Sequence, residues 1–329
     1  MLLSRGECIC CCTLLTLCVF AILYHFSIIN DSIGPIHLQY IHLLRHRPTG
    51  ASSIPKILWY KLGPHGLNND TRNWTSTCIE GNPSYTANFL TDLDAEEFVR
   101  DAFHDRPDIY SAYMGLAVPI LKADMLRYML LYANGGIWSD LDVSCDVAID
   151  EWIPAHYRAD TSMVMGWEFD VGWSPNVLRQ FASWTIMAKP RSPHMLQVID
   201  DIVEALHTTM QKYDVPAENV TLSMTGDVVD FSGPRRLTDG VFKSLEKTMG
   251  RPVDRNEAKD LLKPKMIGDL LVMPGKSFAA GSNHYTPEQE GRLPEQLVTH
   301  HYAGSWKNEK GGEMRRNGMV GAEHQQEAV

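Results

Sequence analysis

Basic residues are scarce in this chain. Its 329 residues include 30 lysines and arginines against 40 aspartates and glutamates, which gives a formal net charge of -10. A chain with no basic stripe has little with which to neutralise a phosphate backbone, so nucleic acid is not an expected partner. The sequence contains no G-x-G-x-x-G motif, which argues against dinucleotide binding of the usual kind. No internal repeat is visible.

Cysteines are also few outside the N-terminal segment. Five of the seven lie between residues 8 and 18, and only Cys78 and Cys145 remain in the rest of the chain. In an oxidising compartment these two could pair, but two cysteines alone do not fix a disulfide. Neither their spacing nor neighbouring histidines indicate a zinc site.

An uncharged segment at residues 8–29 is long enough to cross a bilayer. A cleaved signal peptide is the alternative, but the apolar run exceeds the usual length and no clear cleavage site follows it. We therefore predict a cytosolic tail at 1–7, a transmembrane signal anchor at 8–29 and a stem at 30–53. We also predict a single folded domain at 54–308, followed by a flexible C-terminal tail at 309–329. Sequons at Asn73 and Asn219 suit a lumenal domain.

Strands and helices alternate along the predicted domain, which is typical of an α/β fold with a sheet of mixed direction. The predicted helices span residues 91–100, 119–133, 193–213 and 235–249. The predicted strands span residues 54–62, 163–169, 183–188, 267–273 and 297–302.

The most informative stretch runs from residue 119 to 143. It reads as an amphipathic helix, a stop at Gly135 and a strand that reaches Asp140 and Asp142. Because strand side chains alternate, we expect these two carboxylates and Trp138 on one face. Two converging carboxylates would hold a hard divalent cation together with the phosphate oxygens of a nucleotide.

This stretch resembles the core of glycosyltransferase family 32, the DXD sugar transferases, and is closest to the fungal α-1,6-mannosyltransferases of N-glycan outer chains. Four further blocks match in family order, at residues 54–59, 184–190, 232–238 and 300–307. The resemblance implies a GT-A-like catalytic domain that transfers mannose, with retention, from GDP-mannose to a mannose of an N-glycan. It also implies Mn²⁺ or Mg²⁺ as cofactor and a single-pass type II protein of the Golgi membrane. A Golgi enzyme complex is a further partner.

The resemblance also suggests residue roles. Asp140, Asp142 and Arg127 are the catalytic candidates, and Arg127 faces Asp124 at i,i+3 spacing on the predicted helix. His300 and His301 are candidate metal ligands beside the two aspartates, although alternation along a strand lets at most one of them reach the ion. The candidate donor-binding residues are Asp124, Arg127, Gly135, Gly136, Trp138, Ser305, Trp306 and Lys307, of which the last three would close over the diphosphate.

Three other interpretations are open. A hexosyltransferase acting on inositol phosphorylceramide would fit the same family. A phosphatase of the Asp-x-Asp-x-Val type, with Asp200 and Asp201 as a second acidic pair, lacks the unbroken apolar strand that such a site requires. A non-catalytic sugar-binding module is the third.

For the acceptor, Asp170 and Trp173 are candidate contacts, or else belong to a loop with a buried tryptophan.

Overall fold

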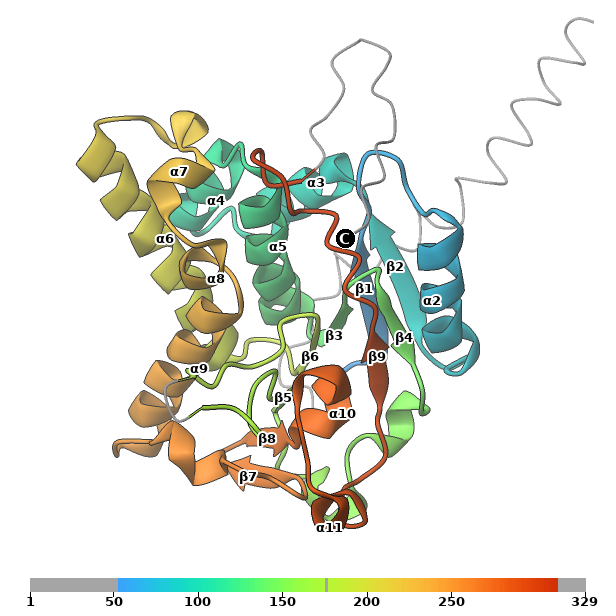
Figure 1. The fold of residues 1–329 in the computed structure, drawn as a ribbon. Coiled ribbons are helices and arrows are strands. Elements are labelled where there is room, and N and C mark those ends of the chain that lie inside the picture. Colours follow the sequence, from blue (N-terminus) through green and yellow to red (C-terminus); the bar gives the residue numbers. More distant parts are fainter. Residues whose placement is uncertain (1–52, 175–176, 313–329) are drawn as a thin grey trace, which may run out of the picture. The chain divides into compact units, whose positions relative to one another are not determined.

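The computed structural model describes residues 53–174 and 177–312, which form an α/β domain around a seven-stranded sheet (Figure 1). The strand order is β2-β1-β3-β6-β5-β8-β7. The β1–β2, β1–β3 and β5–β8 pairs are parallel, and the others are antiparallel. The mixed sheet predicted from the sequence is thus confirmed. The strands are β1 (Ile57–Lys61), β2 (Thr86–Leu90), β3 (Gly136–Ser139), β5 (Met163–Gly166), β6 (Thr185–Ala188), β7 (Lys265–Ile267) and β8 (Leu270–Met273).

Helices cover this sheet because its central strands are apolar on both faces. Every residue of β3, β5, β6 and β8 is buried. Helix α6 packs against both α5 and α9, and Figure 1 shows these three helices on one side of the molecule, with α2 on the other. The longer helices are α2 (Asn69–Glu80), α3 (Asp92–Ala102), α4 (Pro107–Gly115), α5 (Pro119–Asn134), α6 (Pro193–Tyr213) and α9 (Pro234–Met249). The short ones are α7 (Leu222–Thr225), α8 (Val228–Phe231), α10 (Gly275–Ala279) and α11 (Pro287–Glu290).

One predicted strand is in fact a hairpin. Residues 267–273 were expected to form a continuous strand, but the chain reverses at Gly268 and Asp269, and β7 and β8 pair antiparallel through Ile267 and Leu270. A two-residue turn with glycine in its first position suits a hairpin. The apolar run therefore supplies two adjacent strands, β8 and the edge strand β7.

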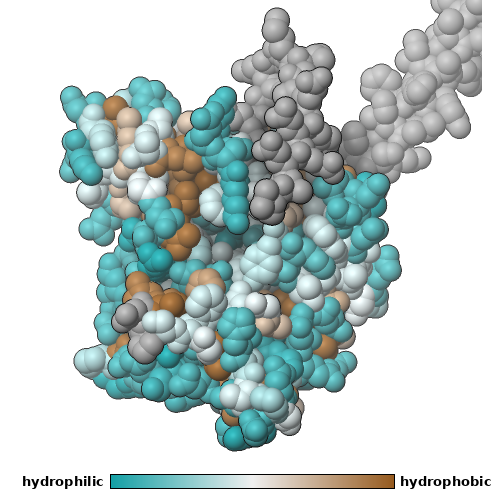
Figure 2. Space-filling view, in the orientation of Figure 1, coloured by the Kyte–Doolittle hydropathy of each residue, from teal (hydrophilic) through white to brown (hydrophobic). Residues whose placement is uncertain are grey.

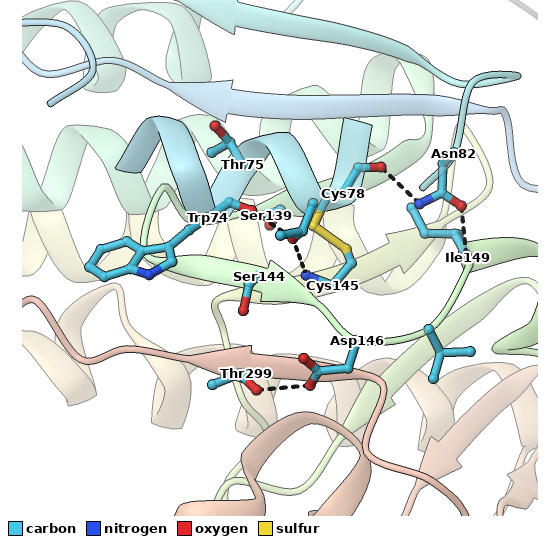
Figure 3. The surroundings of a disulfide bond; sticks show 12 residues. Trp74, Thr75, Cys78, Asn82, Ser139, Ser144, Cys145, Asp146, Ile149 and Thr299 are labelled. Atoms are coloured by element: carbon cyan, nitrogen blue, oxygen red, sulfur yellow. Dashed lines mark hydrogen bonds between the residues drawn. A yellow bond between two sulfur atoms is a disulfide. The ribbon is translucent and has the colours of Figure 1, made fainter. Parts of the chain in front are cut away.

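A second, two-stranded sheet joins β4 (Val143–Cys145) to β9 (Val298–His300). A disulfide between Cys78 of α2 and Cys145 of β4 ties this sheet to the helix and settles the pairing that the sequence left open. Figure 3 shows the hydrogen bonds around it: the Cys145 N–H donates to Thr77 Oγ1 (2.8 Å), and Asn82 Nδ2 donates to the Cys78 carbonyl (2.8 Å). Helix α2, β4 and β9 are thereby fixed as one unit.

Within the described residues, no helix combines the length and apolar character needed to cross a membrane. The predicted tail at 1–7, the anchor at 8–29 and nearly all of the predicted stem lie outside the described residues, as does most of the predicted C-terminal tail.

Candidate metal and donor site

The site begins at the connection between α5 and β3. Pro119 occupies the first turn of the helix, where its missing N–H costs nothing, and the helix ends at Gly135, whose φ is 68°. A Cβ on Gly135 would lie 2.7 Å from Pro190, and one on Gly136 would lie 2.7 Å from the Ile57 carbonyl oxygen. These glycines let β3 pack closely against its neighbours. They lie at the opposite end of β3 from Asp140, and their predicted role in donor binding stays a prediction.

The two aspartates lie in a turn and not, as predicted, on a strand. Strand β3 ends at Ser139, and the Val143 N–H donates to the Asp140 carbonyl (3.2 Å), which reverses the chain into β4. The turn brings the carboxylates together all the same. Ligand atoms of Asp140, Asp142 and His300 all lie within 4.8 Å of one another. The predicted convergence is present, but a turn and not strand alternation produces it.

Asp140 is held by aromatic and cationic neighbours. Trp138 Nε1 donates to Asp140 Oδ1 (2.7 Å), and Arg127 Nη2 lies 3.2 Å from the same oxygen. The Asp140 N–H donates to the Trp184 carbonyl (2.9 Å). Trp138 is thus a side wall of the site that fixes the carboxylate. Its predicted contact with the donor stays a prediction.

Asp142 is held by the segment that follows β9. The Ala303 N–H donates to Asp142 Oδ2 (2.9 Å), the His301 N–H donates to the Asp142 carbonyl (2.8 Å), and His300 Nε2 lies 3.4 Å from Asp142 Oδ1. The position of Asp142, the second aspartate of the motif, therefore depends on contacts with residues 300–303.

Arg127 is buried between two carboxylates. Its Nη2 lies 3.1 Å from Asp124 Oδ1 as well as 3.2 Å from Asp140, and its guanidinium carbon lies 5.2 Å from the Trp138 ring centroid. Ser232 Oγ donates to the other Asp124 oxygen (2.8 Å). Within the described residues, Nε and Nη1 of Arg127 have no hydrogen-bond partner although both are buried. Buried donors without partners are costly, so these groups suit a ligand that brings acceptor oxygens. Asp124 orients Arg127, and its contact with the donor sugar stays a prediction.

Burial raises the pKa values of these carboxyl groups, whereas neighbouring cationic groups lower them. Burial raises the pKa of Asp124 to about 6, against the charge of Arg127 and the hydrogen bond from Ser232. Burial and the charge of Asp142 raise the pKa of Asp140, although Arg127 opposes them. Burial also acts to raise the pKa of Asp142, but the hydrogen bond and charge of His300, together with backbone hydrogen bonds that include the one from Ala303, hold that pKa below its usual range. A bound cation would favour the ionised form of both aspartates.

His300, the last residue of β9, and His301, which follows it, face opposite ways. The ring of His300 stacks on Trp184, with centroids 4.2 Å apart, and its Nδ1 is buried without a partner among the described residues. His301 stacks on Trp74 (4.3 Å), and its Nε2 lies 2.9 Å from Ser144 Oγ. His301 therefore lies outside the group formed by Asp140, Asp142 and His300, in keeping with the expectation that at most one of the two histidines reaches the ion. Two carboxylates and one imidazole form a set that fits Mn²⁺.

The other predicted residues lie around this centre. Ser305 and Trp306 form a turn after Ala303, and the Lys307 N–H donates to the Gly304 carbonyl (2.9 Å). Their closure over a diphosphate stays a prediction. Asp200 and Asp201 pair with Arg106 and Lys243 instead of joining the cluster, so the acidic pair of the phosphatase interpretation is not at the site.

The acceptor candidates differ in character. Asp170 is fully engaged, because it accepts hydrogen bonds from the backbone N–H groups of Asp260 and Leu261 and from Arg179. Asp170 therefore fixes a loop. Trp173 is 42% exposed and packs edge-on against Phe169, so it remains available to a ligand.

Comparison with known proteins identifies the class of site. Residues 68–159 match the family described as "Glycosyltransferase sugar-binding region containing DXD motif". This region runs from the start of α2 through Asp140 and Asp142, so this part of the chain is similar to the DXD region of these glycosyltransferases, which confirms the resemblance predicted from the sequence.

Two of the proteins to which the chain is similar are named as mannosyltransferases. The chain is 30% identical over 267 residues to the initiation-specific alpha-1,6-mannosyltransferase of Schizosaccharomyces pombe, and the match covers 78% of this chain and 65% of that protein. The chain thus spans slightly less than two thirds of the length of that relative. It is 31% identical to the inositol phosphoceramide mannosyltransferase 3 of the same organism, over 33% of this chain and 29% of that protein. A solved structure, the PaToxG glycosyltransferase, matches with a TM-score of 0.42 and 14% identity over 80% of this chain and 92% of that one. The relatives' names agree with the expectation of a hexosyltransferase.

Proposed function

We propose that the protein is a metal-dependent mannosyltransferase that moves mannose, with retention, from GDP-mannose to a mannose of an N-glycan, with an α-1,6 linkage. The observation that carries this proposal is the convergence of Asp140, Asp142 and His300 in front of the buried Arg127. Their spacing and chemistry fit a cation bound to a nucleotide diphosphate.

Each residue of the site has a part in this reaction. Asp140, Asp142 and His300 would hold Mn²⁺, which when bound would neutralise the charge that develops on the leaving diphosphate. Arg127 is held rigidly by Asp124 and Asp140, and its free N–H groups would bind oxygens of the donor. Because its partners fix the guanidinium in advance, little reorganisation is needed when the charge develops. Lys307 would add a further positive group from the turn after β9.

An N-glycan acceptor is favoured by the extent of the matches. The similarity to the initiation-specific α-1,6-mannosyltransferase extends over 78% of this chain, whereas the similarity to the inositol phosphoceramide enzyme extends over 33%. Most of the chain therefore resembles the former, including elements outside the nucleotide site.

The acceptor class can be tested directly. We expect radiolabelled GDP-mannose and Mn²⁺ to label a mannose oligosaccharide and to leave detergent-dispersed inositol phosphorylceramide unlabelled. Chromatographic separation of the two products measures this, and the Asp142→Asn protein is the background control. Label found only in the lipid would overturn the acceptor assignment while leaving the metal site unaffected.

For location, we propose a single-pass type II protein of the Golgi membrane that takes part in a Golgi enzyme complex. This proposal is based on the uncharged segment at residues 8–29. The disulfide between Cys78 and Cys145 suits an oxidising lumen. The sequon residues Asn73 and Asn219 are both exposed and so accessible to glycosylation.

Membrane anchoring gives a second expected result. The full chain should stay with the membrane after carbonate extraction, and glycosidase treatment should increase its mobility on gels. Replacement of Asn73 or Asn219 by glutamine, with Asn256→Gln as a control outside any sequon, maps the glycans. Release of the chain into the soluble fraction would indicate a cleaved signal peptide instead of an anchor.

A further inference from the structure

A groove lies beside the candidate metal site and is not part of the matched DXD region. Its volume is about 480 Å³, which falls in the range of roughly 300–1,000 Å³ found for small-molecule sites. Hydrophobic residues show on this face of the molecule over α8, which contributes Val229 (Figure 2). The groove is lined chiefly by Glu168, Phe169, Leu178, Gln180, Val229 and Arg235.

Two links connect this groove to the metal site. The Glu168 N–H donates to the Gln180 carbonyl (2.8 Å), and the chain continues from Gln180 to Trp184, which stacks on His300 and accepts the N–H of Asp140. Glu168 is also close enough to His300 for the charge of the histidine to lower the pKa of the carboxyl group, although burial raises it overall. A molecule in the groove would therefore lie next to the cluster of ligands.

The lining combines the two kinds of contact that a sugar ring requires. Leu178 is exposed over 57% of its surface and, with Phe169 and Val229, offers apolar contact for the C–H face of a ring. Glu168 and Arg235 offer an acceptor and donors for hydroxyl groups. Glu168 Oε2 accepts from Gln180 Nε2 (2.8 Å), and among the described residues no hydrogen bond engages its Oε1. The Nε of Arg235 is buried and has no hydrogen-bond partner among the described residues.

The charges of the groove disfavour an anionic head group. Arg235 is the cation of the lining, and its Nη1 contacts both oxygens of Asp230 at 2.6 and 2.8 Å. Glu168 contributes a further carboxylate without a cationic partner of its own among the described contacts. A phosphodiester would meet one neutralised cation and one carboxylate, so like-charge repulsion would weaken its binding.

We propose that this groove is the acceptor subsite and takes a neutral saccharide, with Glu168 and Arg235 binding hydroxyl groups and Leu178 contacting a ring face. This inference rests on the proposed sugar transfer and adds to it the place where the acceptor binds and the residues that contact it. A saccharide in the groove would also cover part of Leu178, which is exposed over 57% of its surface.

The test measures saccharide binding without the donor. The full chain, solubilised in detergent, is titrated with α-linked mannotriose and observed by saturation-transfer NMR. Glu168→Gln and Leu178→Ser should each weaken this binding by about tenfold or more, because each removes a contact worth on the order of 1.4 kcal/mol. The matched control is Leu93→Ser, an exposed leucine of α3 outside the groove, which should bind mannotriose like the wild type.

Other measurements separate this inference from the proposed function. All three variants should keep Mn²⁺-dependent GDP binding and the wild-type Tm, and myo-inositol 1-phosphate should displace mannotriose less effectively than mannose does. No mannotriose binding by the wild type, or unchanged binding in both groove variants, would overturn the subsite. Preferential displacement by inositol phosphate would overturn the neutral-saccharide class. Absence of GDP-mannose turnover with mannotriose binding intact would instead refute the proposed transfer.

Discussion

Asp142→Asn is expected to abolish Mn²⁺-dependent GDP binding and to lower sugar transfer by about 10³-fold. The change removes one negative charge from the cluster of Asp140, Asp142 and His300, and it also leaves His300 without its anionic neighbour at 3.4 Å. Losing one electrostatic contact to developing charge typically costs about 10²–10³ in rate. Loss of the proposed cation would add to this, because the same carboxylate would hold the ion and also accepts the Ala303 N–H.

Calorimetric titration with GDP, with and without Mn²⁺, measures the first effect. Asp146→Asn is the matched control, since Asp146 is exposed close by and accepts a hydrogen bond from Thr299 (2.8 Å) without joining the cluster (Figure 3). The control should bind GDP as the wild type does. The same dependence on Mn²⁺ in Asp142→Asn and wild type would refute the metal-site assignment.

Joint replacement of Cys78 and Cys145 by alanine is expected to destabilise the domain by about 4 kcal/mol. The two cysteines are 67 residues apart, and closing a loop of that length removes entropy worth about 4 kcal/mol from the unfolded chain. The double variant should also bind Mn²⁺ and GDP more weakly. The disulfide fixes β4 against α2, and β4 pairs with the strand that carries His300.

Urea unfolding of the double variant and of the wild type, each with and without reductant, measures the stability change. Reductant should lower the stability of the wild type to that of the variant and leave the variant unchanged. A loss of less than about 1 kcal/mol would mean that the reduced chain keeps the loop closed without the covalent bond, contrary to the entropic argument.

Local signals made some elements predictable from the sequence. Helix α6 begins at Pro193 and ends at Tyr213 as expected, and α5 runs from Pro119 to the glycine that ends it. A proline in the first turn and a glycine after the last are chemical requirements of helix ends, so they can be recognised without knowledge of the fold. Helices α2 and α4 were not predicted, because α2 is rich in polar residues and α4 is short and lacks a side-chain N-cap.

The candidate site was predictable in composition but not in geometry. The carboxylates and Arg127 lie within one short stretch, so their proximity could be anticipated. The turn at Asp140 could not, because its second half is fixed by Ala303 and by pairing with β9, which are contacts between distant residues. Ser232, which holds Asp124 from 108 residues away, and Trp184, which orients His300, were missed as site residues for the same reason. The only signal was their presence in the blocks at 184–190 and 232–238.

The pairing of β4 with β9 also sets an order for the maturation of this protein. Ser144 and His301 contact each other although 157 residues separate them in sequence, so this whole length of chain must be synthesised before His300 can reach the two aspartates. A nascent chain emerging from the ribosome would carry the turn at Asp140 and Asp142 early but would lack the His300 side chain of the group. A cation held by all three side chains would therefore bind only after β9 has paired with β4, and a chain truncated before His300 should lack Mn²⁺-dependent GDP binding.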